Sequence, residues 1–214
     1  MEIDQLLTTT RSARKSLDLE ADVDLGEVRE CLRIGLQAAN GSNNQSWRWV
    51  VVTDPVRRGQ VAAQYREAYF EMTGGPVAAQ LGTASPLGRI MNSTEWLVEN
   101  IAEVPTLVIP CYEPYIGETS ENSSFAAATL WGSIFPPVWN FQLALHSRGY
   151  GTCITTLHLN REAQVREILG IPEGYVQGCL LPVARLRSGK VFTPAPRRPL
   201  EEVVVVDAWE GGTL

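Results

Sequence analysis

The sequence predicts a mixed helix-and-strand domain of the α+β or α/β class. Stretches with helical periodicity alternate with a few short runs of β-branched residues, and turns rich in proline or glycine separate them. The chain has 214 residues, of which 44% are hydrophobic and 20% are charged. A chain of this length and composition is expected to form one globular domain over residues 1–214.

The first half of the chain is expected to alternate helix and strand. A helix begins at Asp24, where Glu27 completes a capping-box pattern, and its apolar stripe runs over residues 25–39. Residues 49–53 are a β-branched run typical of a buried strand. A loop is predicted over residues 73–88, which contain four glycines and two prolines. The other expected elements are a helix over residues 55–72, a helix over residues 90–103 with Ile90, Leu97 and Ile101 facing inward, and a strand over residues 106–112.

The second half is expected to hold one long helix and three strands. The long helix begins at Asn122 or Ser123 and runs to about Arg148, with Gly149 as its natural stop. Pro136-Pro137 should break or kink this helix, because proline removes a backbone donor and clashes with the previous turn. The remaining elements are strands over residues 153–157, 176–186 (broken at Pro182) and 203–207, a short helix capped by Asn160 and closed by Gly170, and a turn at Ser188-Gly189.

The composition argues against several classes of function. A net charge of −6 gives no basic face for nucleic acid, and no apolar run reaches the roughly 18 residues that span a bilayer. The N-terminal residues lack an apolar core of signal-peptide length, and the four cysteines form no CxxC pair, so reduced core thiols in a cytoplasmic protein are expected. His146 and His158 have no neighbours at zinc-site spacing, so no metal site is expected, and His158 is expected to pack beside a strand end.

Four short segments could bind an anion or a cofactor. Residues 11–15 combine three cations with a hydroxyl, which suits a phosphate or a solvated basic patch. Residues 40–47 are dense in amides and hydroxyls, which suit a flavin ring edge or a capped loop. Residues 149–153 resemble the start of a dinucleotide-binding loop, but they lack its third glycine and follow a helix, which favours a tight turn close to a ligand. Arg197-Arg198 is a second cationic pair or plain surface charge.

In this order, the four segments resemble the motifs of the nitroreductase family. The family opens with a basic-Ser-x-Arg element, here residues 11–14, and after one amphipathic helix it carries an amide-rich segment, here residues 40–47. A later helix ends in a glycine pair followed by Thr or Ser, here residues 149–152. A basic pair then precedes Pro-Leu and a final strand, here residues 197–200. Residues 131–159 resemble an actinobacterial branch of the family in particular.

The resemblance implies a three-layer sandwich, with a central, mostly antiparallel sheet flanked by helices, and a homodimer that holds FMN between its subunits. Two departures concern the site: Asn40 and Ser46 stand where prolines are usual, and residues 65–89 match no pattern of the family.

The sequence also favours a homodimer independently. Residues 203–207 form an apolar run after a proline-rich approach, and such a strand should be paired, either by a partner or by folding back on its own subunit.

The resemblance also implies the cofactor contacts, residue by residue. Arg14 would lie near the pyrimidine edge of the ring, where positive charge stabilises the anionic reduced flavin. The other implied contacts are Arg11, Ser12, Arg197 and Arg198 with the FMN phosphate, Asn43 and Gln45 with the ribityl chain or ring edge, Thr155 and Thr156 with the ring near its reactive nitrogen, and Asn40, Gly41 and Ser42 from the second subunit.

The implied activity is that of an FMN-dependent oxidoreductase with a ping-pong mechanism. NADH or NADPH gives a hydride to FMN, and a nitroaromatic, a quinone or a similar electron-poor acceptor then takes up the electrons. No catalytic acid–base residue is required, because the flavin carries the hydride chemistry. The open alternatives are flavin fragmentation, dehydrogenation or dehalogenation on the same fold, a deazaflavin-linked enzyme, and a flavin-sequestering protein without turnover.

Overall fold

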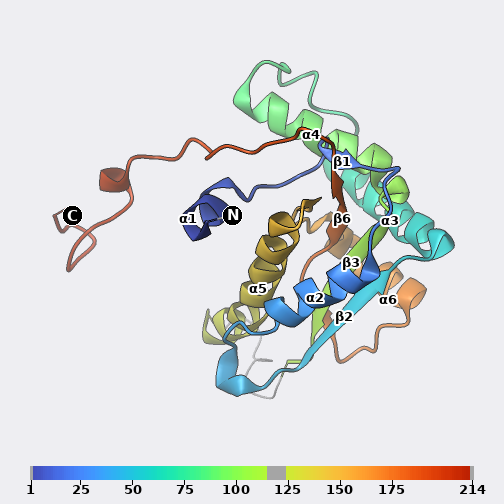
Figure 1. Cartoon of the computed structure of the whole chain (residues 1–214), viewed down its shortest axis with the longest axis horizontal. Helices are drawn as coiled ribbons and strands as arrows, with labels where there is room; N and C mark the ends of the chain where they lie inside the picture. Colours follow the sequence, from blue (N-terminus) through green and yellow to red (C-terminus); the bar gives the residue numbers. More distant parts are fainter. Residues whose placement is uncertain (1, 115–123, 213–214) are drawn as a thin grey trace.

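The computed structural model describes residues 2–114 and 124–212, which form a central antiparallel sheet with helices on both of its faces (Figure 1). The main path of the sheet runs in the order β1 (Leu17–Asp18), β6 (Leu181–Leu186), β3 (Thr106–Tyr112) and β2 (Trp47–Val52). Two short strands complete it, β4 (Tyr150–Gly151) beside β6 and β5 (Val176–Gln177) beside β3. Every pairing between these strands is antiparallel, as predicted for an α+β fold of this type.

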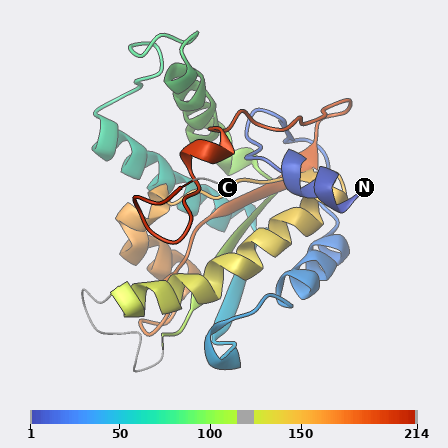
Figure 2. The same ribbon diagram turned by 90° about the vertical axis from the view of Figure 1, so that its left-hand side faces the viewer.

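The described ranges contain six α-helices, and Figures 1 and 2 show α2 and α5 on one face of the sheet with α3 and α6 on the other. Short 3-10 turns lie over residues 41–43, 101–103, 157–161 and 200–202. None of the helices in the described ranges is long and apolar enough to cross a membrane. The helices are α1 (Ile3–Thr9), α2 (Leu25–Gly35), α3 (Pro55–Thr73), α4 (Pro86–Asn100), α5 (Ser124–Ser147) and α6 (Glu162–Leu169).

Strand β3 shows how the core divides into two layers. All seven of its residues are buried, and successive side chains point to opposite faces of the sheet. Leu107 and Ile109 belong to the apolar cluster that contains residues of α3 and α4, whereas Val108 belongs to the cluster that contains residues of α2 and α5. The predicted three-layer sandwich is therefore confirmed.

Helix α2 begins at the predicted cap, but its capping box is only half formed. The Asp24 carboxylate accepts from the backbone N–H groups of Gly26 (2.7 Å) and Glu27 (3.4 Å). The Glu27 side chain instead accepts from the Tyr150 hydroxyl at 2.5 Å and pairs with Arg185 at 2.6 Å. Glu27 thus ties the start of α2 to the sheet.

Helix α5 is continuous through Pro136 and Pro137, so of the predicted break or kink the break does not occur. Pro137 cannot donate to the carbonyl of Ser133, four residues earlier. The indole N–H of Trp47 donates to that carbonyl at 3.0 Å, and this bond from β2 replaces the missing helical one. The predicted helix start at Asn122 or Ser123 lies outside the described residues.

Three strand predictions differ from the structure. Residues 153–157 form only an isolated bridge between Thr155 and Leu180, because the pairing of this segment with β6 ends after Gly151. The predicted strand over residues 176–186 is interrupted at 178–180 and not at Pro182, which lies within β6 opposite Leu107. Residues 203–207 form no strand, because the N–H groups of Val203 and Val204 donate to the Leu200 carbonyl, both at 3.0 Å, and that of Val206 donates to the Gly212 carbonyl at 2.8 Å, so the segment turns back on itself. In Figure 1 this tail extends away from the sheet and the helices.

Three helix details also differ. Helix α2 ends at Gly35, and its buried residues are Val28, Cys31 and Gly35 and not the predicted stripe to residue 39. Asn160 lies inside a 3-10 turn and does not cap α6, although Gly170 ends that helix in the predicted left-handed conformation. Ile90 is exposed, because α4 turns this side toward a surface hollow, whereas Leu97 and Ile101 are buried as predicted.

Gly151 lets three chain segments approach one another closely. A Cβ atom at this position would lie 2.6 Å from Leu186 Cδ2, 2.8 Å from Ala13 Cβ and 2.8 Å from Leu17 Cδ2. The backbone N–H of Ala13 donates to the carbonyl of Thr152 at 2.8 Å, which fixes the N-terminal segment beside β4. Residues 11–17 are thereby held against the end of β4 in a fixed register.

We predict that Gly151→Ala lowers the free energy of unfolding by about 1–3 kcal/mol, because the added methyl group overpacks the contact with Ala13 and Leu17. Gly59→Ala is the matched control, since Gly59 lies within α3 and a Cβ there meets nothing within 4 Å. It should raise stability by about 0.5–1 kcal/mol. Urea unfolding of both variants measures the difference, and equal stabilities would contradict the close packing.

Candidate functional site

A hollow of about 810 Å³ opens beside the N-terminal segment. Its walls come from residues 10–12 and Arg14, from the first turns of α4, from Trp139 of α5, and from the tail at residues 195–197. It thus joins segments from both ends of the chain and from two helices. Three of its walls are polar or cationic, and Trp139 and Ile90 give it apolar surface.

The hollow gathers four guanidinium groups and no carboxylate. Arg11, Arg14, Arg89 and Arg197 all line it, and no Asp or Glu does. Within residues 2–114 and 124–212, none of the four forms an ion pair. Arg11 and Arg197 donate only to backbone carbonyls, at 3.4 and 3.0 Å. In a protein whose net charge is −6, this uncompensated positive charge makes the hollow suited to an anion.

Arg14 connects the hollow to a buried cluster behind it. Burial raises the pKa of the Cys153 thiol to about 11, and the Arg14 guanidinium partly opposes that shift. Burial also raises the pKa of Tyr65, again with Arg14 acting in the opposite direction. The Tyr65 hydroxyl lies 2.8 Å from the hydroxyl of Thr155. Arg14 therefore lies close to the segment that carries Thr155, one of the residues implied for the flavin ring.

The backbone of Thr155 is fixed by Leu180. Its N–H donates to the Leu180 carbonyl at 3.1 Å, and its carbonyl accepts from the Leu180 N–H at 2.8 Å. Gly178, two residues before Leu180, packs closely against α5, since a Cβ there would lie 2.9 Å from Ile134 Cδ1. The turn at residues 178–180 thus serves as a rigid support for Thr155.

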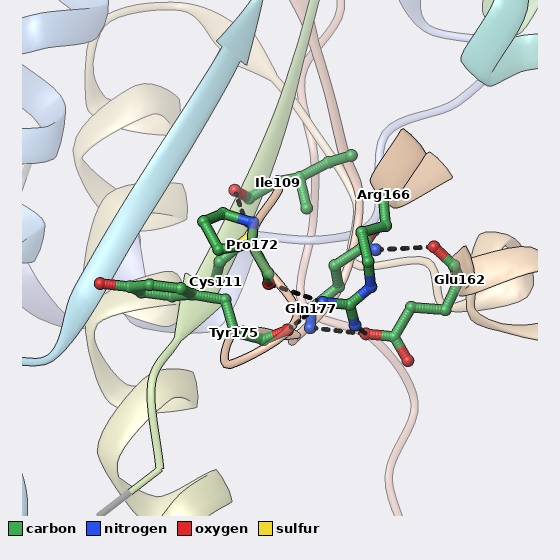
Figure 3. A network of polar contacts seen from close by, with 7 residues as sticks. All are labelled: Ile109, Cys111, Glu162, Arg166, Pro172, Tyr175 and Gln177. Carbon is green, nitrogen blue, oxygen red and sulfur yellow. Dashed lines mark hydrogen bonds and ion pairs between the residues drawn. The ribbon is translucent and has the colours of Figure 1, made fainter. Parts of the chain in front are cut away.

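An arginine clamp fixes the start of that support (Figure 3). The Arg166 guanidinium donates to the carbonyls of Pro172 (2.7 Å) and Tyr175 (3.0 Å) and pairs with Glu162 at 3.3 Å. Gln177 bonds Glu162 twice, from its backbone N–H to the carboxylate and from its side-chain amide to the carbonyl, both at 3.0 Å. The clamp therefore holds β5 against β3 and sets where the 178–180 turn begins.

The segment at residues 40–46 has an unusual backbone. Ser42, Asn43 and Gln45 all have positive φ angles of 52° to 54°, a region that costs about 1–3 kcal/mol for a residue other than glycine. The Asn40 carboxamide oxygen accepts from the Gln45 N–H at 3.1 Å, and the Gly41 N–H donates to the Ser133 hydroxyl at 3.0 Å. These two hydrogen bonds hold a short stretch with three positive φ angles in one conformation.

The structure brings together some of the residues that the sequence implies, and separates others. Arg11, Ser12, Arg14 and Arg197 line the arginine hollow. Asn40 and Gly41 line a different, mostly apolar hollow of about 520 Å³ against α5. The segment at residues 40–46 and the segment at residues 11–14 lie at opposite ends of the view in Figure 1. The remaining implied residues, Ser42, Asn43, Gln45, Thr155, Thr156 and Arg198, line neither hollow, and Arg198 pairs with Glu202.

Sequence reasoning missed Arg89, Ser93 and Trp139. Arg89 and Ser93 lie on α4, in or next to a stretch that matches no recognisable pattern, and Trp139 appears in the sequence as one apolar residue of a long helix.

An anchor holds the loop that leads into α4. The Glu95 carboxylate accepts from the Tyr69 hydroxyl (2.8 Å) and from the N–H groups of residues 77 (2.6 Å) and 78 (2.9 Å). No local signal in the sequence reports such a contact.

The arrangement of sheet and helices has known counterparts. The family model of the Nitroreductase family matches residues 7–185. The chain belongs to the nitroreductase family. The match includes the segments at residues 11–14, 40–47 and 149–152, whose resemblance the sequence had indicated. A comparison with curated protein sequences gives no match.

Solved structures of nitroreductase type share the fold over nearly the whole chain. A point mutant of NfnB, an FMN- and NADPH-dependent nitroreductase from Sphigopyxis sp. strain HMH, is 19% identical, covers 99% of this chain and 100% of its own, and has a TM-score of 0.71. A BluB-like flavoprotein from Clostridium difficile 630 is 18% identical, with 96% and 98% covered and a TM-score of 0.69. Iodotyrosine deiodinase bound to FMN and 3-iodo-L-tyrosine is 19% identical, with 97% and 99% covered and a TM-score of 0.66. At these identities the similarity establishes the fold.

His158 follows Thr155 and Thr156 in the chain and is fully buried. Neither ring nitrogen has a hydrogen-bond partner among the described residues, and burial lowers the pKa of His158 to about 4. A neutral imidazole without polar contacts has a packing role, as the sequence predicted. The four cysteines are likewise free and buried, which confirms the prediction of reduced core thiols.

We predict that His158 makes the fold less stable in acid. The unfolded histidine has a pKa of about 6.5, so between pH 6.5 and 4 the unfolded chain binds a proton that the folded chain does not. The free energy of unfolding should fall by up to roughly 3 kcal/mol over that range through this residue. Denaturant unfolding at pH 7 and pH 4.5 measures the loss. His158→Leu should show a smaller loss than the parent protein, and an identical pH dependence would contradict the assignment.

Proposed function

We propose that this chain is one FMN-binding domain over residues 1–214 and a cytoplasmic FMN-dependent oxidoreductase. It takes a hydride from NADH or NADPH and reduces a nitroaromatic, quinone or similar electron-poor acceptor by a ping-pong mechanism. The observation that carries the proposal is the hollow with four arginines and no carboxylate. A phosphate monoester carries about −1.5 to −2 charges at neutral pH and accepts several hydrogen bonds, so this set of donors fits it.

The proposed contacts follow the walls of the hollow. Arg11, Ser12 and Arg197 would hold the phosphate, with Arg198 joining them from the tail, and Arg14 would face the pyrimidine edge of the ring. The position of Arg14 beside Tyr65 and Cys153 supports this, because it places a cation at the inner end of the hollow. The other proposed contacts are Asn43 and Gln45 with the ribityl chain or ring edge, Thr155 and Thr156 with the ring, and Asn40, Gly41 and Ser42 from a second subunit.

The role of the protein in this reaction is to bind and position. When bound, FMN would supply the hydride chemistry, so no acid–base side chain is assigned. Arg14 would stabilise negative charge on the reduced ring, Trp139 and Ile90 would give apolar surface near the mouth, and the anchored α4 would close one side. The similarity to an FMN- and NADPH-dependent nitroreductase supports this choice of donor and reaction. The similarity to an FMN-bound deiodinase keeps dehalogenation as the second candidate.

A homodimer is part of the proposal. Helix α5 has no Asp, Glu, Lys or Arg between Ser124 and Ser147, yet it exposes Phe125, Trp131 and Trp139. The tail exposes Trp209, and its residues 203–207 pair with no strand in the described part of the chain. Apolar surface of this extent indicates a protein interface. The separation of Asn40 and Gly41 from the arginine hollow in one subunit also supports a site completed by a second copy.

We expect the purified protein to be yellow, or to become so with added FMN, with the absorption maxima of oxidised flavin. Anaerobic NADPH or NADH should bleach these maxima, and menadione or a nitroaromatic should restore them. Bleaching by neither nucleotide would favour a flavin-sequestering protein. A colourless protein that also fails to take up FMN would contradict the proposal.

We predict that Arg14→Ala weakens FMN binding about tenfold to a hundredfold while the fold stays intact, because a charge-assisted hydrogen bond contributes about 1.5–3 kcal/mol. Reduction by NADPH should also slow. Titration of apoprotein with FMN and stopped-flow absorbance measure the two effects. Arg57→Ala removes an equal charge from the surface of α3 and should change neither. If Arg14→Ala keeps the parental FMN affinity and the parental rate of reduction, Arg14 is not part of the site.

We expect light scattering to give twice the mass of one chain for the full-length protein at micromolar concentration. Truncation before Pro194 removes Arg197, Arg198 and the exposed apolar tail, so it should yield a less stable protein without flavin. Addition of FMN to the truncated protein should not restore binding. A flavin-loaded monomer of full length would contradict the shared site.

A further inference from the structure

Tyr65 is a phenol in the apolar core whose hydroxyl meets the hydroxyl of Thr155, one of the contacts proposed for the flavin ring. It lies on α3, only 1% of its surface is exposed, and it belongs to the cluster of buried aliphatic and aromatic residues on that side of the sheet. Its hydroxyl lies 2.8 Å from the Thr155 hydroxyl, and it has no second hydrogen-bond partner among the described residues. A buried hydroxyl with one partner depends on that partner for its geometry.

As a hydrogen-bond donor, Thr155 can offer a ligand only its hydroxyl, because its N–H already bonds Leu180. Both of its backbone groups are used by Leu180, as donor at 3.1 Å and as acceptor at 2.8 Å. Its side chain is half-buried, so one side faces Tyr65 and the other remains accessible. The adjacent Thr156 is exposed, and its hydroxyl bonds nothing in the described part of the chain. Of the two threonines, only Thr155 has a fixed side chain.

The chemistry of the pair sets the direction of the hydrogen bond. A phenol is a stronger acid than an aliphatic alcohol and therefore the better donor. Burial keeps Tyr65 protonated by raising its pKa, and the positive Arg14 nearby disfavours an O–H that points toward it. Tyr65 then donates to Thr155, and the hydroxyl hydrogen of Thr155 is left to point away from Tyr65, toward the open side.

We propose that Tyr65 is a positioning residue, which holds the Thr155 hydroxyl as a fixed donor toward an acceptor atom of the flavin ring. This inference rests on the proposed function, because it assumes that a flavin occupies the site. An oxidised flavin has unprotonated ring nitrogens and carbonyl oxygens that accept hydrogen bonds. A donor fixed in advance favours binding, because no rotamer freedom is lost when the bond to the ligand forms.

The test compares variants of the flavin-loaded protein by FMN dissociation constant and by midpoint potential. Tyr65→Phe keeps the ring and removes the hydroxyl, and it should weaken FMN binding about threefold to tenfold and shift the potential. Thr155→Val should do the same, and the double variant should be no worse than Thr155→Val alone. Thr155→Ser, which keeps the hydroxyl, should restore most of the affinity.

Two matched controls separate positioning from packing. Tyr150→Phe removes another buried phenol hydroxyl, one bonded to Glu27 on α2, and Thr106→Val removes a buried threonine hydroxyl from β3. Both should keep the parental dissociation constant and potential. If Tyr65→Phe lowers only the melting temperature, as Tyr150→Phe should, or if its effect on the FMN dissociation constant multiplies with that of Thr155→Val, the inference is wrong. A parent protein that binds no FMN would overturn the proposed function, and this inference with it.

Discussion

The contact at Gly151 is the constraint on which the rest of the site depends. Because this residue has no side chain, Ala13, Leu17 and Leu186 can all pack against one point of the backbone. The N-terminal segment then lies beside the segment that leads to Thr155, although most of the chain separates them in sequence. Strand β6 makes this possible, because it pairs with β1, β3 and β4 at once. The arginines of the first segment and the hydroxyl of the second are positioned by the same packing.

Charge is the second organising feature. Four arginines surround one hollow of this acidic protein without an ion pair among residues 2–114 and 124–212, so the local potential is opposite in sign to the net charge. The surrounding structure holds those groups apart from carboxylates. Glu27 pairs with Arg185, and Glu95 accepts from backbone N–H groups, so both acids are used elsewhere. The hollow can therefore attract an anion, and the apolar surface of Trp139 lies beside it for a planar group.

Local patterns in the sequence predict only those features that local contacts determine. The bounds of the strand at residues 106–112 were correct, because a continuous apolar run between turns determines them. The break at Pro137 was wrong, because the bond that compensates for the proline comes from Trp47, far away in the sequence. The strand at residues 203–207 was wrong for a related reason, since a strand needs a neighbour and these residues bond Leu200 and Gly212 in turns instead. Four implied residues meet in the hollow, whereas Arg89 belongs to no motif and only the fold places it there.

The most direct test of the shared site is a crystal structure of the protein grown with FMN. We expect the FMN phosphate against Arg11, Ser12 and Arg197, the ring near Thr155, and residues 40–42 of a second subunit completing the site. FMN bound away from the arginine hollow, or bound there by one subunit without the second, would contradict the shared site.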